Sequence, residues 1–215
     1  KQIWDETRDR ATVEVYANAL ISDSFPVMRR EIEELIANLA NGRKIRGYRV
    51  AAIEEDFFDQ QWFGFGQKFL WKSAIVNILE ELMEEKYHHL VFCGRSGDVV
   101  VILAFENEEE AQAYSGEEFI RLCRFVQNKL SFSVTCALSD VVQDWKDIPR
   151  AYDKAAYLLE RKLQLGFGKI LTATDLNHLS ERIQYFHIPT ENLIASLRNA
   201  NEKELQNTIS ELFTT

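Results

Sequence analysis

Residues 88–106, HHLVFCGRSGDVVVILAFE, decide how the rest of the chain can fold. Two apolar runs, 90–93 and 99–105, flank the polar, glycine-containing turn 94–98. β-branched and aromatic residues on both sides of such a turn are typical of a β-hairpin. The second run contains no polar residue, which predicts a strand that is covered on both faces. A hairpin of this kind needs other elements of the chain to pack over it.

Composition narrows the class of protein. The chain has 215 residues, 46% of them hydrophobic, which is enough for a packed domain with attachments. Its net charge of −9 argues against a basic face that binds nucleic acid. There is no run of 18 apolar residues and no signal peptide, so we expect a cytoplasmic segment without membrane contact. Because the chain begins without Met, we also expect it to be a piece of a longer protein.

The cysteines and histidines do not suggest a metal site. Cys93, Cys123 and Cys136 each stand in an apolar context, and their spacing fits no metal-binding pattern. We interpret them as reduced core residues of a cytosolic protein. His88 and His89 are adjacent at the start of a predicted strand, where neighbouring side chains point to opposite faces. The sequence therefore predicts neither a metal ion nor a cofactor.

The N-terminal region, residues 1–43, is predicted to be a helical linker with a break near Pro26. Apolar residues after the break recur at spacings of three and four, as in a heptad seam. These residues are Phe25, Met28, Ile32, Leu35 and Leu39. The pattern is short, and two interpretations stay open. The helix can form the seam of a homodimer, or it can pack on its own domain.

Residues 44–176 are predicted to form one α+β domain with an antiparallel sheet. The patterns predict strands at 48–53, 90–93, 99–105, 131–138 and 169–172. One helix follows residue 66, between the first two strands, and two more begin near 117 and 147, before the fourth and fifth strands. Crossovers of this order predict helices on one face of the sheet, as in ferredoxin-like folds. Residues 177–215 carry capping patterns for two short helices without a strand, which indicates a helical connector.

The acidic end of the first strand and the hairpin turn together resemble the nucleotide-cyclase palm of GGDEF domains. Glu54-x-Asp56-x-Phe58 aligns with the Asp-x-Asp-x-Phe that ends the first strand of that family. The run 96–100, Ser-Gly-Asp-Val-Val, falls where the signature Gly-Gly-Asp-Glu-Phe stands on the hairpin tip. The second acidic position of the signature is therefore Val99. The nucleotide-binding residues of the family are not matched by 59–62, Asp-Gln-Gln-Trp.

A broader resemblance covers nearly the whole chain. It is to the degenerate GGDEF-like middle domains of YesN-type response regulators of the AraC family, with related domains in CdaR and PucR regulators. The stretches that carry it are 25–30 (FPVMRR), 139–165 with WKDIPRAY inside it, and the tail 191–213. This resemblance implies a receiver domain of a two-component system or a membrane sensor upstream. It also implies a helix-turn-helix domain downstream, through which the full-length protein would bind DNA.

Three functions follow as hypotheses. The resemblance implies a non-catalytic, homodimeric domain that couples an N-terminal input to the C-terminal helix-turn-helix. A second hypothesis is a ligand sensor that retains a nucleotide-like cleft, with the aromatic stretch 57–69 lining a pocket. A third is a residual Mg-dependent cyclase in which Glu54 and Asp98 approach each other and hold the metal. We assign no catalytic residue, and the vestigial ligand site is predicted to comprise Glu54, Asp56, Arg95, Gly97 and Asp98.

Overall fold

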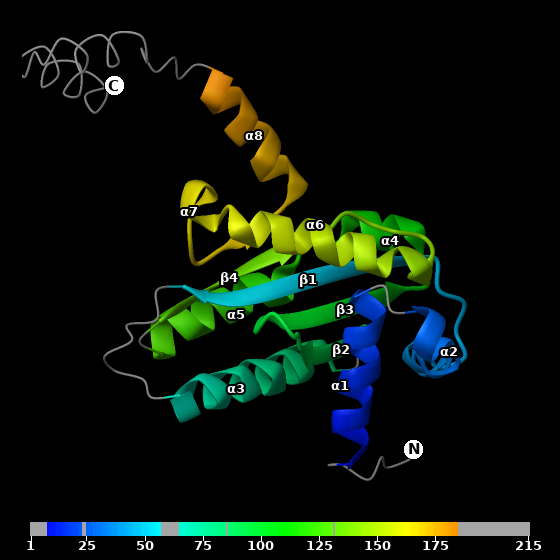
Figure 1. The fold of residues 1–215 in the computed structure, drawn as a ribbon. Helices are drawn as coiled ribbons and strands as arrows, with labels where there is room; N and C mark the ends of the chain where they lie inside the picture. Colours follow the sequence, from blue (N-terminus) through cyan, green and yellow to red (C-terminus); the bar gives the residue numbers. More distant parts are fainter. Residues whose placement is uncertain (1–7, 23–24, 57–64, 85, 131, 185–215) are drawn as a thin grey trace, which may run out of the picture. The chain divides into compact units, whose positions relative to one another are not determined.

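The structure is a computed structural model that describes residues 8–22, 25–56, 65–84, 86–130 and 132–184. Contacts divide the chain into two units, Lys1–Leu176 and Asn177–Thr215, and Figure 1 traces the chain. The predicted helices of the tail, in 191–213, lie outside the described residues, as do the side chains of the aromatic stretch 57–69. None of the helices in the described ranges is long and apolar enough to cross a membrane.

One five-stranded sheet organises the first unit. It contains β1 (Gly47–Asp56), β2 (His88–Cys93), β3 (Val99–Phe105), β4 (Ser133–Leu138) and β5 (Ile170–Leu171), in the spatial order β2-β3-β1-β4-β5. All neighbours are antiparallel except β4 and β5. The predicted hairpin is present, with Cys93 paired to Val99. Every residue of β3 is buried, which confirms that this strand is covered on both faces.

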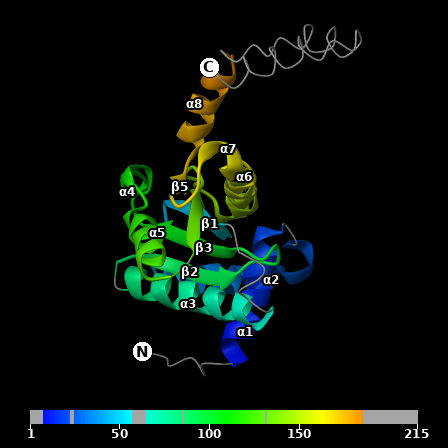
Figure 2. The ribbon, with the colours of Figure 1, turned by 90° about the vertical axis from the view of Figure 1, so that its left-hand side faces the viewer.

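Helices cover both faces of this sheet, so the expectation of helices on one face is wrong. On one face lie α3 (Phe65–Met83), α4 (Glu108–Ala113) and α5 (Glu117–Lys129); on the other lie α1 (Arg8–Ile21), α2 (Phe25–Ala40) and α6 (Ile148–Glu160). Figure 2 shows the sheet between these two layers. The physical reason is that β1 and β3 are apolar on both sides, and each side has to be removed from water. The N-terminal helices, interpreted from sequence as a linker, supply part of that cover.

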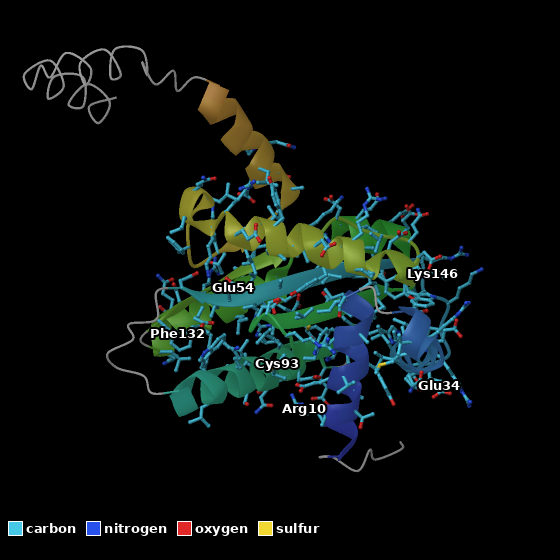
Figure 3. All side chains as sticks on the ribbon, viewed as in Figure 1. Arg10, Glu34, Glu54, Cys93, Phe132 and Lys146 are labelled. Atoms are coloured by element: carbon cyan, nitrogen blue, oxygen red, sulfur yellow. The ribbon has the colours of Figure 1, made fainter. Side chains whose placement is uncertain are left out.

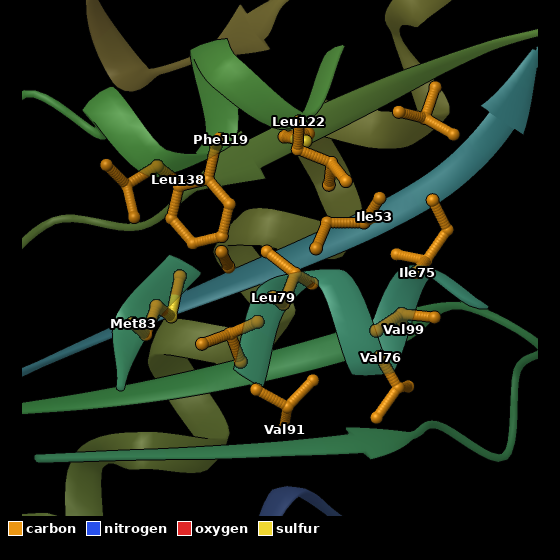
Figure 4. Packing of buried hydrophobic residues seen from close by; sticks show 14 of the residues in the cluster. Ile53, Ile75, Val76, Leu79, Met83, Val91, Val99, Phe119, Leu122 and Leu138 are labelled. Carbon is orange, nitrogen blue, oxygen red and sulfur yellow. The ribbon is translucent and has the colours of Figure 1, made fainter. Parts of the chain in front are cut away.

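The core between the sheet and α3 and α5 contains most of the large buried side chains (Figure 4). Leu79 of α3 and Phe119 and Leu122 of α5 are fully buried against it. Burial of each such side chain stabilises the fold by about 1.5–3 kcal/mol. Cys123 and Cys136 are buried in the same core as free thiols, as predicted, whereas Cys93 is only partly buried against it.

The predicted seam of α2 packs within its own chain. Ile32 and Leu35 are buried in the cluster formed with α1, and Met28 and Leu39 are partly buried against it. The side chain of Phe25 lies outside the described residues. The structure therefore shows α2 packed on its own domain, which is one of the two interpretations. The homodimer stays a prediction, and it needs a surface other than Ile32 and Leu35.

Candidate functional site

The acidic end of β1 and the hairpin turn are neighbours, as their predicted order required. Ile53 pairs with Val99, so Glu54 and Asp98 are the next residues beyond that pair on adjacent strands. Ile53 and Val99 face α3 and α5. Because side chains alternate along a strand, Glu54, Asp56 and Asp98 belong to the opposite face, the one that α6 covers. Figure 3 shows Glu54 near the end of β1.

A lysine side chain lies among the oxygens of this acidic strand end. Lys162, the first residue of α7 (Lys162–Leu165), donates from Nζ to Glu54 Oε2 at 3.0 Å and to the carbonyl oxygen of Glu55 at 2.9 Å. The same nitrogen is 3.5 Å from Asp56 Oδ1. Only 17% of the Lys162 side chain is exposed, so this ammonium group is largely withdrawn from water. The site predicted from the acidic residues thus contains its own cation.

Asp56 has a structural set of partners besides this lysine. Its carboxylate accepts hydrogen bonds from Ser133 Oγ at 2.8 Å, from Thr135 Oγ1 at 2.8 Å and from the backbone N–H of Gly168 at 3.0 Å. Ser133 and Thr135 lie on β4, and Gly168 precedes β5. A buried carboxylate requires such compensation for its lost hydration. Asp56 therefore joins β1, β4 and the segment before β5.

The divalent metal that the GGDEF resemblance implies does not fit these residues. A metal ion on the oxygens of Glu54 and Glu55 would meet the ammonium group of Lys162, which carries charge of the same sign within hydrogen-bonding distance of both. Val99, in place of an acidic residue, supplies no oxygen from its side chain. Within the described part of the chain, no group of three or more His, Cys, Asp or Glu side chains is arranged to hold a metal.

Asp98 is turned into the protein and is 2% exposed. Its Oδ2 accepts a hydrogen bond of 3.0 Å from the hydroxyl of Tyr152 on α6, whereas Oδ1 has no hydrogen-bond partner among the described residues. Burial raises the pKa of Asp98, and the hydrogen bond from Tyr152 acts against that shift. Burial together with the charge of Asp98 raises the pKa of Tyr152 to about 12. The carboxylate thus connects the hairpin turn to α6.

The raised pKa of Asp98 predicts a specific dependence of stability on pH. Because the folded state disfavours the charged form, wild type gains stability as the pH falls from above the raised pKa towards the ordinary value of 3.8. Asp98→Asn removes the charge and keeps an oxygen that accepts from Tyr152. We expect the stability of this variant relative to wild type to be greatest at neutral pH and to decrease with acidification. Urea unfolding over a pH series measures this difference.

The exposed neighbour Asp153 provides the control for this measurement. Asp153→Asn should follow the wild-type dependence across the whole pH series, since residue 153 is exposed and its replacement leaves the contact between Asp98 and Tyr152 in place. A constant offset between Asp98→Asn and wild type, independent of pH, would contradict the assignment of the effect to Asp98.

The start of the turn is bonded to the N-terminal helix α1. Asn18 is 6% exposed and donates from Nδ2 to the carbonyl oxygen of Cys93 at 2.9 Å. Its Oδ1 accepts from the backbone N–H of Arg95, also at 2.9 Å. Glu14, one helical turn earlier, accepts from the N–H of Cys93 at 3.4 Å. The buried amide group of Asn18 therefore binds the backbone on both sides of Gly94, where the turn begins.

The five predicted site residues are neighbours in the fold but do not form one binding set. Glu54 and Asp56 share Lys162, while Asp98 faces Tyr152. Arg95 contributes its backbone to the contact with Asn18, and its side chain is exposed. Gly97 takes a positive φ of 93°, which glycine adopts without strain. The turn is thus held by backbone bonds and by α1 and α6.

Sequence reasoning missed the residues that complete this site. Lys162 lies 108 residues from Glu54 and Asn18 lies 75 residues from Cys93, so no local spacing relates the partners. The one available signal was the position of Asn18. Asn18 stands among the apolar residues Ala17, Ala19 and Leu20, and a polar residue inside such a run is typical of a buried, hydrogen-bonded side chain.

Comparison with known proteins supports the fold that these residues occupy. No curated protein matches the chain. Residues 27–160, which are more than half of the chain, match the GGDEF-like domain family, and they contain the sheet strands β1 to β4 with the hairpin turn. The match agrees with the mixed α+β architecture and its mostly antiparallel sheet. The chain therefore belongs to the GGDEF-like domain family.

Proposed function

We propose that this chain is a non-catalytic relay domain of an AraC-family transcription regulator, of the response-regulator type. In this role it couples an N-terminal input to a C-terminal helix-turn-helix, and it acts as a homodimer in the cytoplasm. The fold class is that of a nucleotide cyclase, but the functional elements are the helices that contact the hairpin turn. The AraC context rests on the resemblance of 25–30, 139–165 and 191–213 to YesN-type middle domains.

The observation that carries the proposal is a continuous set of hydrogen bonds from α1 through the turn to α6. Asn18 binds the backbone of Cys93 and Arg95, and Asp98 at the other end of the turn accepts from Tyr152. The helix α1 also contacts α6 directly. A displacement of α1 would move the turn, and a moved turn would change the support of α6. Coupling of this kind needs packed elements in physical contact, which this turn supplies.

The occupied acidic strand end supports the non-catalytic part of the proposal. Transfer of a nucleotidyl group requires a divalent cation to neutralise the triphosphate. The ammonium group of Lys162 takes the oxygens of Glu54 and Glu55 on which such a cation would depend. The ammonium group of Lys162 stabilises the acidic residues, but unlike a metal ion it cannot coordinate the phosphate oxygens of a nucleotide. The same observation disfavours a residual cyclase and a sensor that uses the old metal-dependent nucleotide cleft.

Removal of the Asn18 side chain tests the relay. In Asn18→Ala the turn loses two hydrogen bonds to a buried amide, each worth about 1 kcal/mol. We expect amide hydrogen exchange at 93–98 to accelerate up to about thirtyfold. If the turn transmits the change, exchange in α6 around Tyr152 also accelerates. Mass spectrometry of peptides from these segments measures both responses.

The matched control is Asn38→Ala, since Asn38 is an exposed residue of the same type on α2. This control should leave both segments at the wild-type exchange rate. Peptides from α5, which lies on the other face of the sheet, should be unaffected by either variant. Faster exchange at 93–98 with no change in α6 would show that the turn does not pass the displacement on, and the relay proposal would fail.

A further inference from the structure

A hollow of about 880 Å³ lies away from the hairpin turn, at the opposite ends of β2 and β3. Three segments that are distant in sequence form its walls, namely 86–88 before and at the start of β2, 104–107 at the end of β3, and residues 110–114 at the end of α4. This volume is within the range of roughly 300–1,000 Å³ that is usual for sites of small molecules. None of the predicted site residues lines it.

Aromatic rings form one wall of this hollow. Tyr87, Phe105 and Tyr114 all line it, and their ring centroids are 5.3–6.1 Å apart in edge-to-face or tilted arrangements. Tyr87 and Tyr114 are only partly buried, so ring surface remains open to the hollow. The face of an aromatic ring is electron-rich and attracts a cation placed over it.

The charges around these rings are predominantly negative. Glu110 lines the hollow and has no ion-pair partner among the described residues. Glu117 and Glu118 are close enough that, with burial as the main cause, they raise the pKa of Tyr87. Lys86, a cation of the wall, is already bound to the buried carboxylate of Glu118 at 3.4 Å.

Glu106 completes the rim of the hollow and is shared between His88 and Arg43. Across this region three cations, Lys86, Arg43 and Arg49, stand against the four carboxylates of Glu106, Glu110, Glu117 and Glu118. Arg49 is engaged by the backbone, since it donates to the carbonyl oxygen of Tyr114 at 2.7 Å. The field in the hollow therefore favours a positively charged ligand.

We propose that this hollow binds a small organic ammonium ion, with its alkylated head against Tyr87 and Tyr114 and its charge compensated by Glu110. Within the described residues no group of three or more His, Cys, Asp or Glu side chains is arranged to hold a metal ion, whereas aromatic rings suit a weakly hydrated alkylammonium group. The inference is independent of the relay function, because its residues lie outside the path from Asn18 to Tyr152.

Choline is a suitable probe, because its neutral carbon isostere, dimethylbutanol, has the same shape without the charge. We expect choline to shift the amide resonances of 86–88 and 110–114 saturably in NMR titrations of the full chain, and the isostere to shift them at least about fivefold more weakly. Glu110→Gln should weaken choline binding about threefold, and Tyr87→Leu about fivefold.

Two variants provide matched controls. Glu109→Gln removes a neighbouring exposed carboxylate of α4 that does not line the hollow, and Tyr157→Leu removes a half-exposed tyrosine on α6. Both should bind choline like wild type. Equal binding of choline and its isostere, or binding that Glu110→Gln leaves unchanged, would overturn the proposal. Should Tyr87→Leu fail to fold, the exposed substitution Glu110→Gln and the isostere still decide the question.

Discussion

Replacing Lys162 with methionine is expected to lower the free energy of unfolding by about 2–4 kcal/mol at neutral pH. Methionine keeps most of the volume of the side chain but removes the ammonium group. Asp56, whose side chain is fully buried, would then lose its cation, and Glu54 would lose a hydrogen bond of 3.0 Å. Breaking a buried ion pair by removing one partner is costly because the other charge stays in a medium of low polarity. Chemical denaturation measures the loss.

Lys154→Met is the matched control for this effect. Lys154 pairs with Asp140 at 3.0 Å, but about half of each side chain is exposed to water. Exposed pairs contribute about 0–1 kcal/mol, so this variant should be nearly as stable as wild type. An equal, small loss in both variants would contradict the role assigned to Lys162.

The same variant tests whether Lys162 keeps a divalent cation away from the acidic end of β1. With the ammonium group removed, Glu54, Asp56 and the carbonyl oxygen of Glu55 become available to another cation. We expect Mg²⁺ or Mn²⁺ to raise the melting temperature of Lys162→Met but not that of wild type or Lys154→Met, because a ligand that binds the folded state stabilises it. Neither wild type nor variant should convert GTP in the presence of Mg²⁺. Product from wild type would contradict the non-catalytic proposal.

Much of the fold follows from patterns confined to a few residues. The apolar run 99–105 predicts a strand with two buried faces, and β3 is buried at every position. The alternation in 131–138 places Val134, Cys136 and Leu138 on one side, where they join the core with α5. Such signals succeed because burial and strand geometry act residue by residue. The side of the sheet on which a helix packs depends on partners far along the chain, and there the expectation of one covered face was wrong.

The candidate site shows the same division. The strand order predicts that Glu54 and Asp98 lie close together, and the pairing of Ile53 with Val99 confirms it. Whether these carboxylates can bind a ligand depends on Lys162 and Tyr152, which already contact them. These partners lie far away in the sequence, so no local pattern predicts the contacts. An acidic motif can therefore mark a strand end correctly while its chemistry is changed by one distant residue.

Gly94→Ala is expected to destabilise the protein by about 3 kcal/mol, through an overlap inside the hairpin turn. A methyl group at residue 94 would overlap Asp98 Oδ1 and lie 2.9 Å from its Cγ. It would also lie 3.1 Å from Cγ2 of Val100, which is fully buried. Asp98 cannot move aside without loss, because Tyr152 holds its other oxygen. Thermal or urea unfolding gives the change in stability.

A double-mutant cycle with Asp98→Ala isolates the cause. If overlap with the carboxylate dominates, Gly94→Ala should cost at least about 1 kcal/mol less in the Asp98→Ala background than in wild type. Gly42→Ala is the control, since Gly42 has a positive φ of 74° with no atom within 4 Å of the added methyl group; only backbone strain of about 1 kcal/mol is expected there. Additive losses at residues 94 and 98 would place the strain in the backbone of the turn. A strong coupling would show that residue 94 has to be glycine because the carboxylate of Asp98 is folded inward, towards α6.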